Sequence, residues 1–399
     1  MVTFSTGRRA AAALLSMLAL ASVVCGCAAT APVSVPPATV PAGTGCPPSV
    51  TGGTAAASTA STTVFWPAVG RAGVPWRSVG RGWILADLTR PSSPGGPGTL
   101  YLVSAGGQRY RLGPAPANAL LEDWSGDGTH ALFVRQLLKP TRASVIVLDL
   151  PTGQASSFTV YFPTPAVTAS FSRPAGTAIL LLAAADEGFL PLQRFSLTGA
   201  QELCYPQADG VDAGGYQENA NGTAIVFGTQ NGMEVVTSAG QLVRTLATQY
   251  TPGLCQMLNW WNNQSVLADC SGQLLALPLS GGPPEQLTTS RDPGSFLGAW
   301  HLPSGTYAEA AACGSTWLER LNPDGTATRL TIPGEPDGGR VQPLGAYGDQ
   351  LPLQVAGGCA RYPYSFIEWY NPATGVARPV LGGPAGGGYV TDPILFPAS

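Results

Sequence analysis

Short apolar runs separated by Gly, Pro, Asn and Asp recur along most of this 399-residue chain. After residue 30, no window of useful length keeps the 3.6-residue period of an amphipathic helix. Short apolar runs bounded by turn-forming residues are typical of strands. The pattern therefore predicts an all-β chain that is rich in turns.

The stretch from Leu120 to Val160 shows the pattern most clearly. A Gly126-Asp127-Gly128 turn follows its first strand, and a basic loop at Leu137–Arg142, which holds the only lysine, separates its middle strands. The turn Pro151-Thr152-Gly153 precedes the last strand. The predicted strands are Leu120–Ser125, Ala131–Gln136, Val145–Leu150 and Ser156–Val160.

The rest of the chain repeats this unit with a period near 45 residues. Two rows of turn residues mark the repeat, one after each third strand and one between each first and second strand. The first row is Gly106, Gly153, Gly199, Gly240, Gly281, Gly325 and Gly375. The second row is Gly80-Arg81, Asp127-Gly128, Ala175-Gly176, Asn221-Gly222, Asn262-Asn263, Ser304-Gly305 and Gly348-Asp349.

Seven four-stranded units of this length predict a β-propeller with seven blades, with six or eight blades as alternatives. The grouping in fours argues against a pair of β-sandwiches or a β-solenoid. Two spare segments could close the ring, Thr63–Trp66 before the first unit and Tyr389–Phe396 after the last. We expect the C-terminal segment to pack against the first blade, because an open ring would expose sheet edges.

The units also resemble the TolB-type, or WD40-like, propeller repeat. The closest match is Trp124-Ser125-Gly126-Asp127-Gly128 followed by Val145–Gly153, with Gly126 where the repeat usually has proline. The resemblance spans residues 70–382. Its motifs are structural, so it implies a propeller fold and transfers no catalytic residue.

The N-terminus has the pattern of an export signal. Arg8-Arg9 precede Ala10–Val24, an apolar stretch that is shorter than the roughly 20 residues of a membrane-spanning helix. Val24-Cys25-Gly26-Cys27 resembles the bacterial lipobox, which implies lipidation of Cys27 and a location on the outer face of the cytoplasmic membrane. Cleavage after Ala29-Thr30-Ala31, which would release a secreted protein, is the alternative.

Three regions follow from these patterns. Residues 1–27 form a lipoprotein-type signal peptide, 28–61 a disordered tether rich in Ala, Pro, Thr and Ser, and 62–399 the propeller. The formal charge is −3, or −5 once Arg8 and Arg9 are removed, and no basic stripe remains. We therefore expect no nucleic-acid partner, and we expect a monomer.

Six cysteines follow the signal, which in an exported chain suggests disulfides. Cys255 and Cys270 are equidistant from the Asn262-Asn263 turn, so a hairpin would place them opposite each other. A bond between Cys313 and Cys359 of adjacent blades, and one between Cys46 and Cys204, would complete the set. Partly free thiols are the alternative; zinc ligation is disfavoured because no C-x-x-C pair exists.

Catalytic signals are lacking. The two histidines, His130 and His301, fit structural positions on strands, and no metal site, cofactor motif or known catalytic motif is indicated. Whether the chain is an enzyme stays open, but this pattern favours a non-enzymatic module that binds a protein or glycan in the cell envelope. The alternative is an extracellular hydrolase or lyase with loop carboxylates around the central funnel. Aromatic residues could line a binding face: Trp260, Trp261, Tyr362, Tyr364, Phe366, Trp369 and Tyr370.

Overall fold

A computed structural model of the chain describes residues 67–89, 98–138, 141–161, 167–185, 188–189, 192–205, 215–229, 232–247, 255–270, 272–288, 295–312, 315–336, 339–357, 364–383 and 388–397. The signal peptide (1–27), the tether (28–61) and the segment Thr63–Trp66 therefore lie outside the described residues. Within the described residues, all regular structure is strand except for two short 3-10 turns, η1 (Arg71–Gly73) and η2 (Trp76–Ser78).

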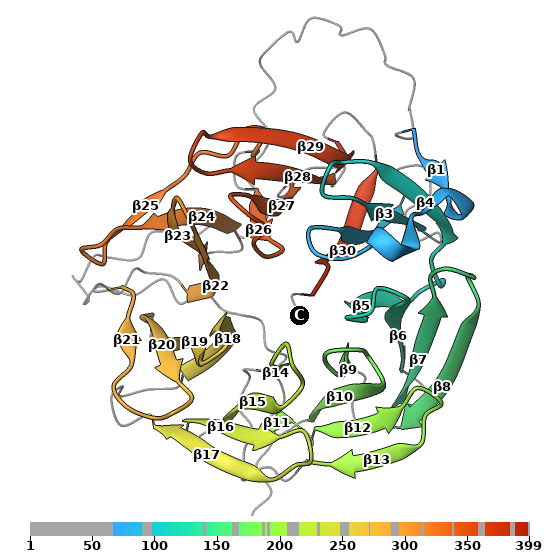
Figure 1. Cartoon of the computed structure of the whole chain (residues 1–399), viewed down its shortest axis with the longest axis horizontal. Coiled ribbons are helices and arrows are strands. Elements are labelled where there is room, and N and C mark those ends of the chain that lie inside the picture. The colour runs from blue at the N-terminus through green and yellow to red at the C-terminus, as the bar shows by residue number, and fades with distance from the viewer. Residues whose placement is uncertain are drawn as a thin grey trace, which may run out of the picture.

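The strands group by antiparallel pairing into seven four-stranded blades arranged in a ring, as Figure 1 shows. From the innermost strand outward, blade 1 is β30 (Tyr389–Leu395), β2 (Ile84–Thr89), β3 (Thr99–Val103) and β4 (Arg109–Pro114). In the same direction, blade 2 is β5 (Leu120–Trp124), β6 (His130–Leu138), β7 (Thr141–Asp149) and β8 (Ala155–Tyr161). Blade 3 is β9 (Val167–Phe171), β10 (Ala178–Ala185), β12 (Gln193–Ser196) and β13 (Gln201–Cys204), with β11 (Gly188–Phe189) beside β10.

The other four blades follow in chain order. Blade 4 is β14 (Tyr216–Glu218), β15 (Ala224–Thr229), β16 (Gly232–Thr237) and β17 (Leu242–Ala247). Blade 5 is β18 (Cys255–Asn262), β19 (Ser265–Cys270), β20 (Leu274–Pro278) and β21 (Glu285–Gln286). Blade 6 is β22 (Ser295–Leu302), β23 (Gly305–Ala312), β24 (Ser315–Leu321) and β25 (Ala327–Arg329). Blade 7 is β26 (Arg340–Pro343), β27 (Leu351–Ala356), β28 (Ser365–Asn371) and β29 (Val376–Gly382).

The core lies between the blades. Successive side chains of a strand point to opposite faces. In blade 2, Phe133 therefore packs toward blade 1, while Leu132 packs toward blade 3. One buried cluster of this kind fills each of the seven junctions between neighbouring blades. The alternation of apolar residues on both faces is therefore what holds the ring together.

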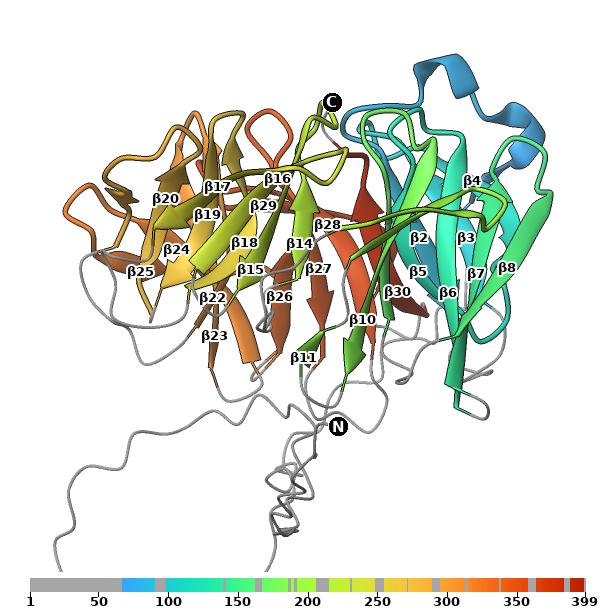
Figure 2. The same ribbon diagram turned by 90° about the horizontal axis from the view of Figure 1, so that it is seen from below.

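The C-terminal strand closes the ring. β30 pairs antiparallel with β2, from Ile84↔Leu395 to Thr89↔Tyr389, which confirms the expected packing of the C-terminal segment on the first blade. The Gly80-Arg81 turn is consequently not a first hairpin, because the residues before it form η2 and β30 fills the inner position. β1 (Val69–Gly70) adds to the outer edge of β4 in parallel. The described residues that follow β30 lie at one face of the ring, near its centre (Figures 1 and 2).

The glycine row is confirmed at the turns after the third strands. Gly153, Gly199, Gly240, Gly281, Gly325 and Gly375 all have φ between 69° and 90°, a region that favours glycine. In blade 1 the positive φ falls on Gly107 instead of Gly106. The expected loop at Leu137–Arg142 is shorter than predicted, because the pairing of β6 with β7 continues to Leu138↔Thr141.

Candidate functional site

The inner strands surround a central cavity of about 910 Å³. This volume lies within the range of about 300–1,000 Å³ that is typical of small-molecule sites. The side chains that line the cavity come from six of the seven inner strands and from the turns that follow them. Among them are Arg81, Glu122, Asp123, Ser170, Arg173, Tyr216, Gln217, Glu218, Asn221, Asn259, Trp260, Asn262, Asn263, Trp300, Tyr347 and Phe396.

Carboxylates of blade 2 form one wall of this cavity. The inner edge of β9 has no neighbouring strand, so its N–H groups need another acceptor. Asp123 Oδ2 accepts from the N–H of Phe171 at 2.7 Å, and Glu122 accepts from the N–H of Ala169. Asp269 accepts from the N–H of Phe296 at 2.9 Å in the same way between blades 5 and 6. These acids therefore join blade 2 to blade 3 and blade 5 to blade 6.

Arg173 connects three blades at this wall. From the turn of blade 3, its guanidinium donates to Asp123 Oδ1 of blade 2 at 2.9 Å and to the carbonyl of Trp124 at 3.2 Å. Its backbone N–H donates to Glu218 Oε2 of blade 4 at 2.6 Å. The charge of Asp123 is thus paired inside the wall, and Glu218 is held in place by a backbone donor.

Burial shifts the protonation of the two glutamates. Desolvation raises the pKa of Glu122 to about 7; the hydrogen bond from Ala169 opposes this, while the negative charges of Asp392 and Asp123 add to it. Desolvation also raises the pKa of Glu218 to about 7, against the lowering effect of the Arg173 N–H and charge. Both carboxyl groups therefore titrate near neutrality.

The opposite wall is aromatic and carries amides. Trp260 of β18 and Trp300 of β22 are both half-buried, each packed on one side against an inter-blade cluster. Asn259 lies between the two strands, where its Nδ2 donates to the carbonyls of Trp260 and Ala299. The indole Nε1 of Trp260 is buried and has no hydrogen-bond partner among the described residues.

A nucleophile with a neighbouring base is not found among the described lining residues. Tyr216 donates to the carbonyl of Leu180 at 2.9 Å, so the hydroxyl of Ser170, 2.8 Å away, donates to Tyr216. His130 begins β6 and His301 lies on β22, as expected, and neither lines the cavity. The described residues also contain no group of three or more His, Cys, Asp or Glu that could hold a metal ion.

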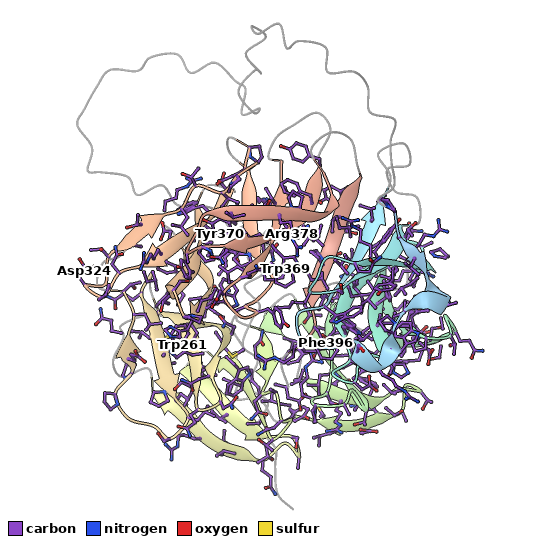
Figure 3. All side chains as sticks on the ribbon, turned by 45° about the horizontal axis from the view of Figure 1, so that its top comes forward. Trp261, Asp324, Trp369, Tyr370, Arg378 and Phe396 are labelled. Atoms are coloured by element: carbon purple, nitrogen blue, oxygen red, sulfur yellow. A yellow bond between two sulfur atoms is a disulfide. The ribbon has the colours of Figure 1, made fainter. Side chains whose placement is uncertain are left out.

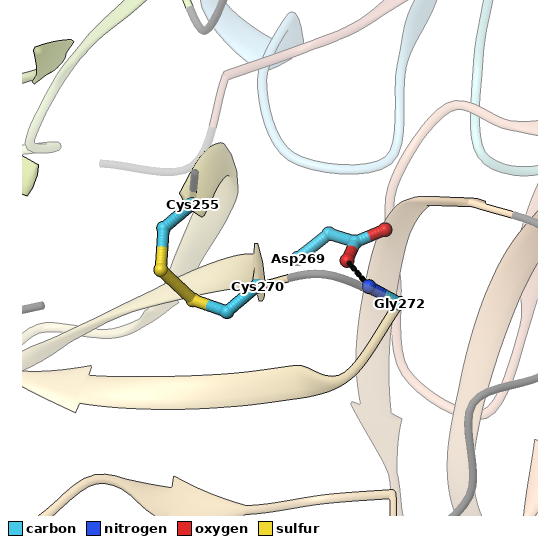
Figure 4. Close-up of a disulfide and its surroundings, with 4 residues drawn as sticks. All are labelled: Cys255, Asp269, Cys270 and Gly272. Carbon is cyan, nitrogen blue, oxygen red and sulfur yellow. Dashed lines mark hydrogen bonds between the residues drawn. A yellow bond between two sulfur atoms is a disulfide. The ribbon is translucent and has the colours of Figure 1, made fainter. Parts of the chain in front are cut away.

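The disulfide predicted between Cys255 and Cys270 is confirmed, with directly paired residues and a Cα–Cα distance of 4.1 Å (Figure 4). The hairpin that produces it differs from the prediction. The turn is centred on Asn263-Gln264, because Asn262 pairs with Ser265. Two bulges in β18, each adding one residue, restore the register that places the cysteines opposite each other.

The other cysteines have different outcomes. Cys204 is a free, exposed thiol on β13, so its predicted bond to Cys46 is wrong. β13 is the outermost strand of its blade, and the side chain of Cys204 is exposed to solvent. Cys46, Cys313, Cys359 and the lipidation candidate Cys27 lie outside the described residues, and their roles stay predictions.

Most of the aromatic candidates serve packing instead of binding. Trp369 and Tyr370 (Figure 3) are buried between blades, as is Phe366. Tyr364 stacks on Phe366. Trp261 contacts His301 edge-on at a centroid distance of 6.3 Å, outside the cavity lining. Trp260 alone among them lines the cavity; Tyr362 lies outside the described residues.

Sequence reasoning did not find Glu122, Arg173, Glu218 or Trp300. Each is one polar or aromatic residue in a strand or turn of its own repeat, separated from the next by 40 or more positions. One signal was available: all four lie on the first strand of a unit or in the turn that follows it. First strands line the centre of a propeller, so polar side chains there identify the cavity wall.

Comparison with solved structures supports the fold. The chain is similar to the β-propeller domain of the Trilobed protease from Pyrococcus furiosus (TM-score 0.52, 11% identity, 76% of this chain and 95% of that chain). It is also similar to a prolyl endopeptidase (TM-score 0.52, 11% identity), covering 80% of this chain but only 49% of that one. TolB from Acinetobacter baumannii has a TM-score of 0.41 at 16% identity, over 78% of this chain and 66% of that chain, which is too low to confirm a TolB-type relationship.

These similarities, at such low identity, define the protein as a β-propeller and nothing finer. No protein-family model matches the chain, and no curated protein matches it significantly. Among the described residues, no helix has the length and apolarity needed to cross a membrane.

Proposed function

We propose that this chain is an exported, monomeric binding propeller, anchored through a lipid on Cys27, whose central cavity holds a protein segment or glycan of the cell envelope. The observation that carries the proposal is the cavity of about 910 Å³, which has one acidic wall and one aromatic wall. The signal-like start, the lipobox-like Val24–Cys27 and the uncharged tether 28–61 support the location.

The contacts of the cavity wall favour binding over catalysis. Asp123 is paired with Arg173, Glu218 accepts the N–H of Arg173, and Glu122 accepts the N–H of Ala169. Groups that hold the blades together are poorly placed to move during a reaction. They do form a rigid, preorganised surface, which favours binding because little ordering is needed.

A hydrolase or lyase is the second candidate, and one observation favours it. Glu122 and Glu218 both line the cavity, and both have a pKa of about 7. Carboxyl groups whose pKa is raised toward neutrality are suited to general acid–base catalysis. The two functions differ in whether the bound molecule is recovered unchanged.

The experiment is a binding assay with envelope fragments of the source bacterium, using the full chain in mild detergent. Gln217→Trp places a large side chain at an exposed position of the cavity wall. Ser157→Trp, exposed on the outer strand β8, is the matched control. Because all three proteins carry the same N-terminus, a difference between them isolates the cavity.

We expect the wild type and Ser157→Trp to sediment with the fragments and Gln217→Trp to remain in the supernatant. Equal sedimentation of all three would refute a role for the cavity. The eluted envelope material is then analysed by mass spectrometry. Recovery of cleaved material with the wild type and Ser157→Trp, but not with Gln217→Trp, would favour the hydrolase or lyase.

A further inference from the structure

We propose that the central cavity binds a short neutral saccharide, with Trp260 and Trp300 against the sugar rings and the carboxyl wall contacting the hydroxyl groups. This inference rests on the proposed binding function and names the class of its ligand.

The size of the cavity limits the occupant. About 910 Å³ is enough for a chain of a few sugar units or a few residues of peptide, and far too little for a folded domain. The ligand is therefore a small molecule or the end of a polymer that enters the ring from one face.

The two tryptophans provide apolar surface at the cavity wall. Each is half-buried and packed on one side into the core, Trp260 at the junction of blades 4 and 5 and Trp300 at that of blades 6 and 7. The faces of a pyranose ring carry C–H groups and are apolar, so a fixed aromatic side chain matches them. Trp260 adds a buried N–H that has no hydrogen-bond partner among the described residues, and an unpaired buried donor is destabilising. A ligand oxygen that accepted this N–H after a small indole rotation would recover part of that cost.

The carboxyl wall, which faces the two tryptophans across the cavity, offers hydrogen-bonding groups with little net charge. Asp123 and Arg173 neutralise each other at 2.9 Å. Burial raises the pKa of Glu122 and Glu218 to about 7, so at mildly acidic pH both are neutral carboxyl groups that donate and accept hydrogen bonds. Sugar hydroxyl groups also both donate and accept hydrogen bonds, so they can pair with these neutral carboxyl groups.

A basic peptide is the competing ligand, and the charges disfavour it. The lining includes two arginines, Arg81 and Arg173, against three acids. With Glu122 and Glu218 protonated, the remaining acid Asp123 is already paired with Arg173. A lysine side chain would then lose its hydration and find no unpaired carboxylate among the described lining residues.

Amide side chains add neutral hydrogen-bonding groups to the lining. Asn221 and Asn263 come from the turns of blades 4 and 5, and Asn262 ends β18. Amides are uncharged donors and acceptors, so they match the hydroxyl groups of a neutral saccharide.

The test uses the full chain in detergent and three probes: maltohexaose, cellohexaose and the tetramer of N-acetylglucosamine. Hexalysine is the competing probe. Binding is measured at pH 6 by saturation-transfer NMR and by quenching of tryptophan fluorescence. We expect at least one oligosaccharide to bind saturably and hexalysine not to bind. Binding of hexalysine alone, or of none of the four probes, overturns the proposal.

Variants then locate the contact. Trp260→Ala and Trp300→Ala should weaken the saccharide about tenfold or more. Because these changes remove core packing, Trp260→Phe and Trp300→Phe serve as folded counterparts. Trp260→Phe keeps an aromatic ring but lacks the N–H, and should weaken binding about threefold to tenfold. Trp261→Phe, outside the lining, is the control and should bind as the wild type does.

The outcomes separate this inference from the proposed function. If the Trp260 and Trp300 variants bind the saccharide as tightly as the wild type, the proposed contact is wrong. If Gln217→Trp loses envelope binding but no saccharide binds the wild type, the proposed binding function of the cavity still holds. Only the inference that its ligand is a saccharide is then refuted.

Discussion

Arg173 and Asp123 form a mostly buried ion pair at 2.9 Å that joins blade 3 to blade 2, with side chains 16% and 8% exposed. The two residues lie 50 positions apart, and the N–H of Phe171 binds the same carboxylate. Removal of one partner leaves the other buried charge unpaired, which is more costly than loss of the pair as a whole.

We therefore predict that Arg173→Ala lowers the free energy of unfolding by about 3 kcal/mol. Urea unfolding followed by tryptophan fluorescence measures this. Glu202→Gln, in the exposed pair of Arg194 and Glu202, is the control and should change stability by less than about 1 kcal/mol. Similar decreases in the free energy of unfolding for both variants would show that the Arg173–Asp123 pair stabilises the protein no more than a surface pair does.

Gly126 is predicted to tolerate no side chain. A Cβ at this position would lie 1.8 Å from the carbonyl oxygen of Pro174 in the turn of blade 3. This explains why glycine stands where the TolB-type repeat usually has proline. Gly126→Ala should destabilise the protein by about 2 kcal/mol or more, because the obstacle is backbone. Thermal unfolding of the two variants and the wild type measures this. Gly80→Ala, with open space around its Cβ, is the control and should stay within about 1 kcal/mol of the wild type.

The Cys255–Cys270 bond should contribute about 3 kcal/mol, since its sequence separation is 15 residues. The double variant Cys255→Ser/Cys270→Ser tests this by urea unfolding, with Cys204→Ser as the control that should leave stability unchanged. Alkylation before reduction should label Cys204 and spare the other two. Labelling of Cys255 in the unreduced protein would contradict the pairing.

Stability should fall as the pH rises from about 4.5 to about 8. Burial raises the pKa of Glu309 to about 8 and of Glu368 to about 7, and both are almost fully buried. Between the unfolded and folded pKa values the native state holds protons that the unfolded state has released, so stability is fully present below the unfolded pKa and is lost as pH rises through the folded one.

The variants Glu309→Gln and Glu368→Gln should flatten this dependence, because the amide does not ionise. The measurement is the urea midpoint at several values of pH. Glu202→Gln on the surface should keep the wild-type slope. A slope of the opposite sign in the wild type would contradict the assignment of these glutamates.

Lipidation is predicted at Cys27. The wild type should incorporate labelled palmitate and fractionate with membranes, whereas Cys27→Ser should carry no label. Cys25→Ser, two residues earlier, should still be labelled. Unlabelled wild-type protein in the medium would instead indicate ordinary cleavage and secretion.

The sequence by itself determined the all-β class, the seven repeats, the closing strand and one disulfide. These follow from local patterns: alternating apolar residues, glycines at turns that need positive φ, and cysteines placed symmetrically about a hairpin. The Cys255–Cys270 pair was found although the turn was misplaced, because two bulges in β18 compensate the shift.

The tertiary structure alone decided the site. Asp123, Arg173 and Glu218 belong to three repeats, and the contacts of Arg173 with both acids require the ring to bring successive inner strands together. The same holds for Gly126, whose lack of a side chain is explained only by Pro174 of the next blade. Local pattern encodes which face of a strand is buried. Which polar groups meet at the centre depends on how the blades pack, and that is a property of the closed ring.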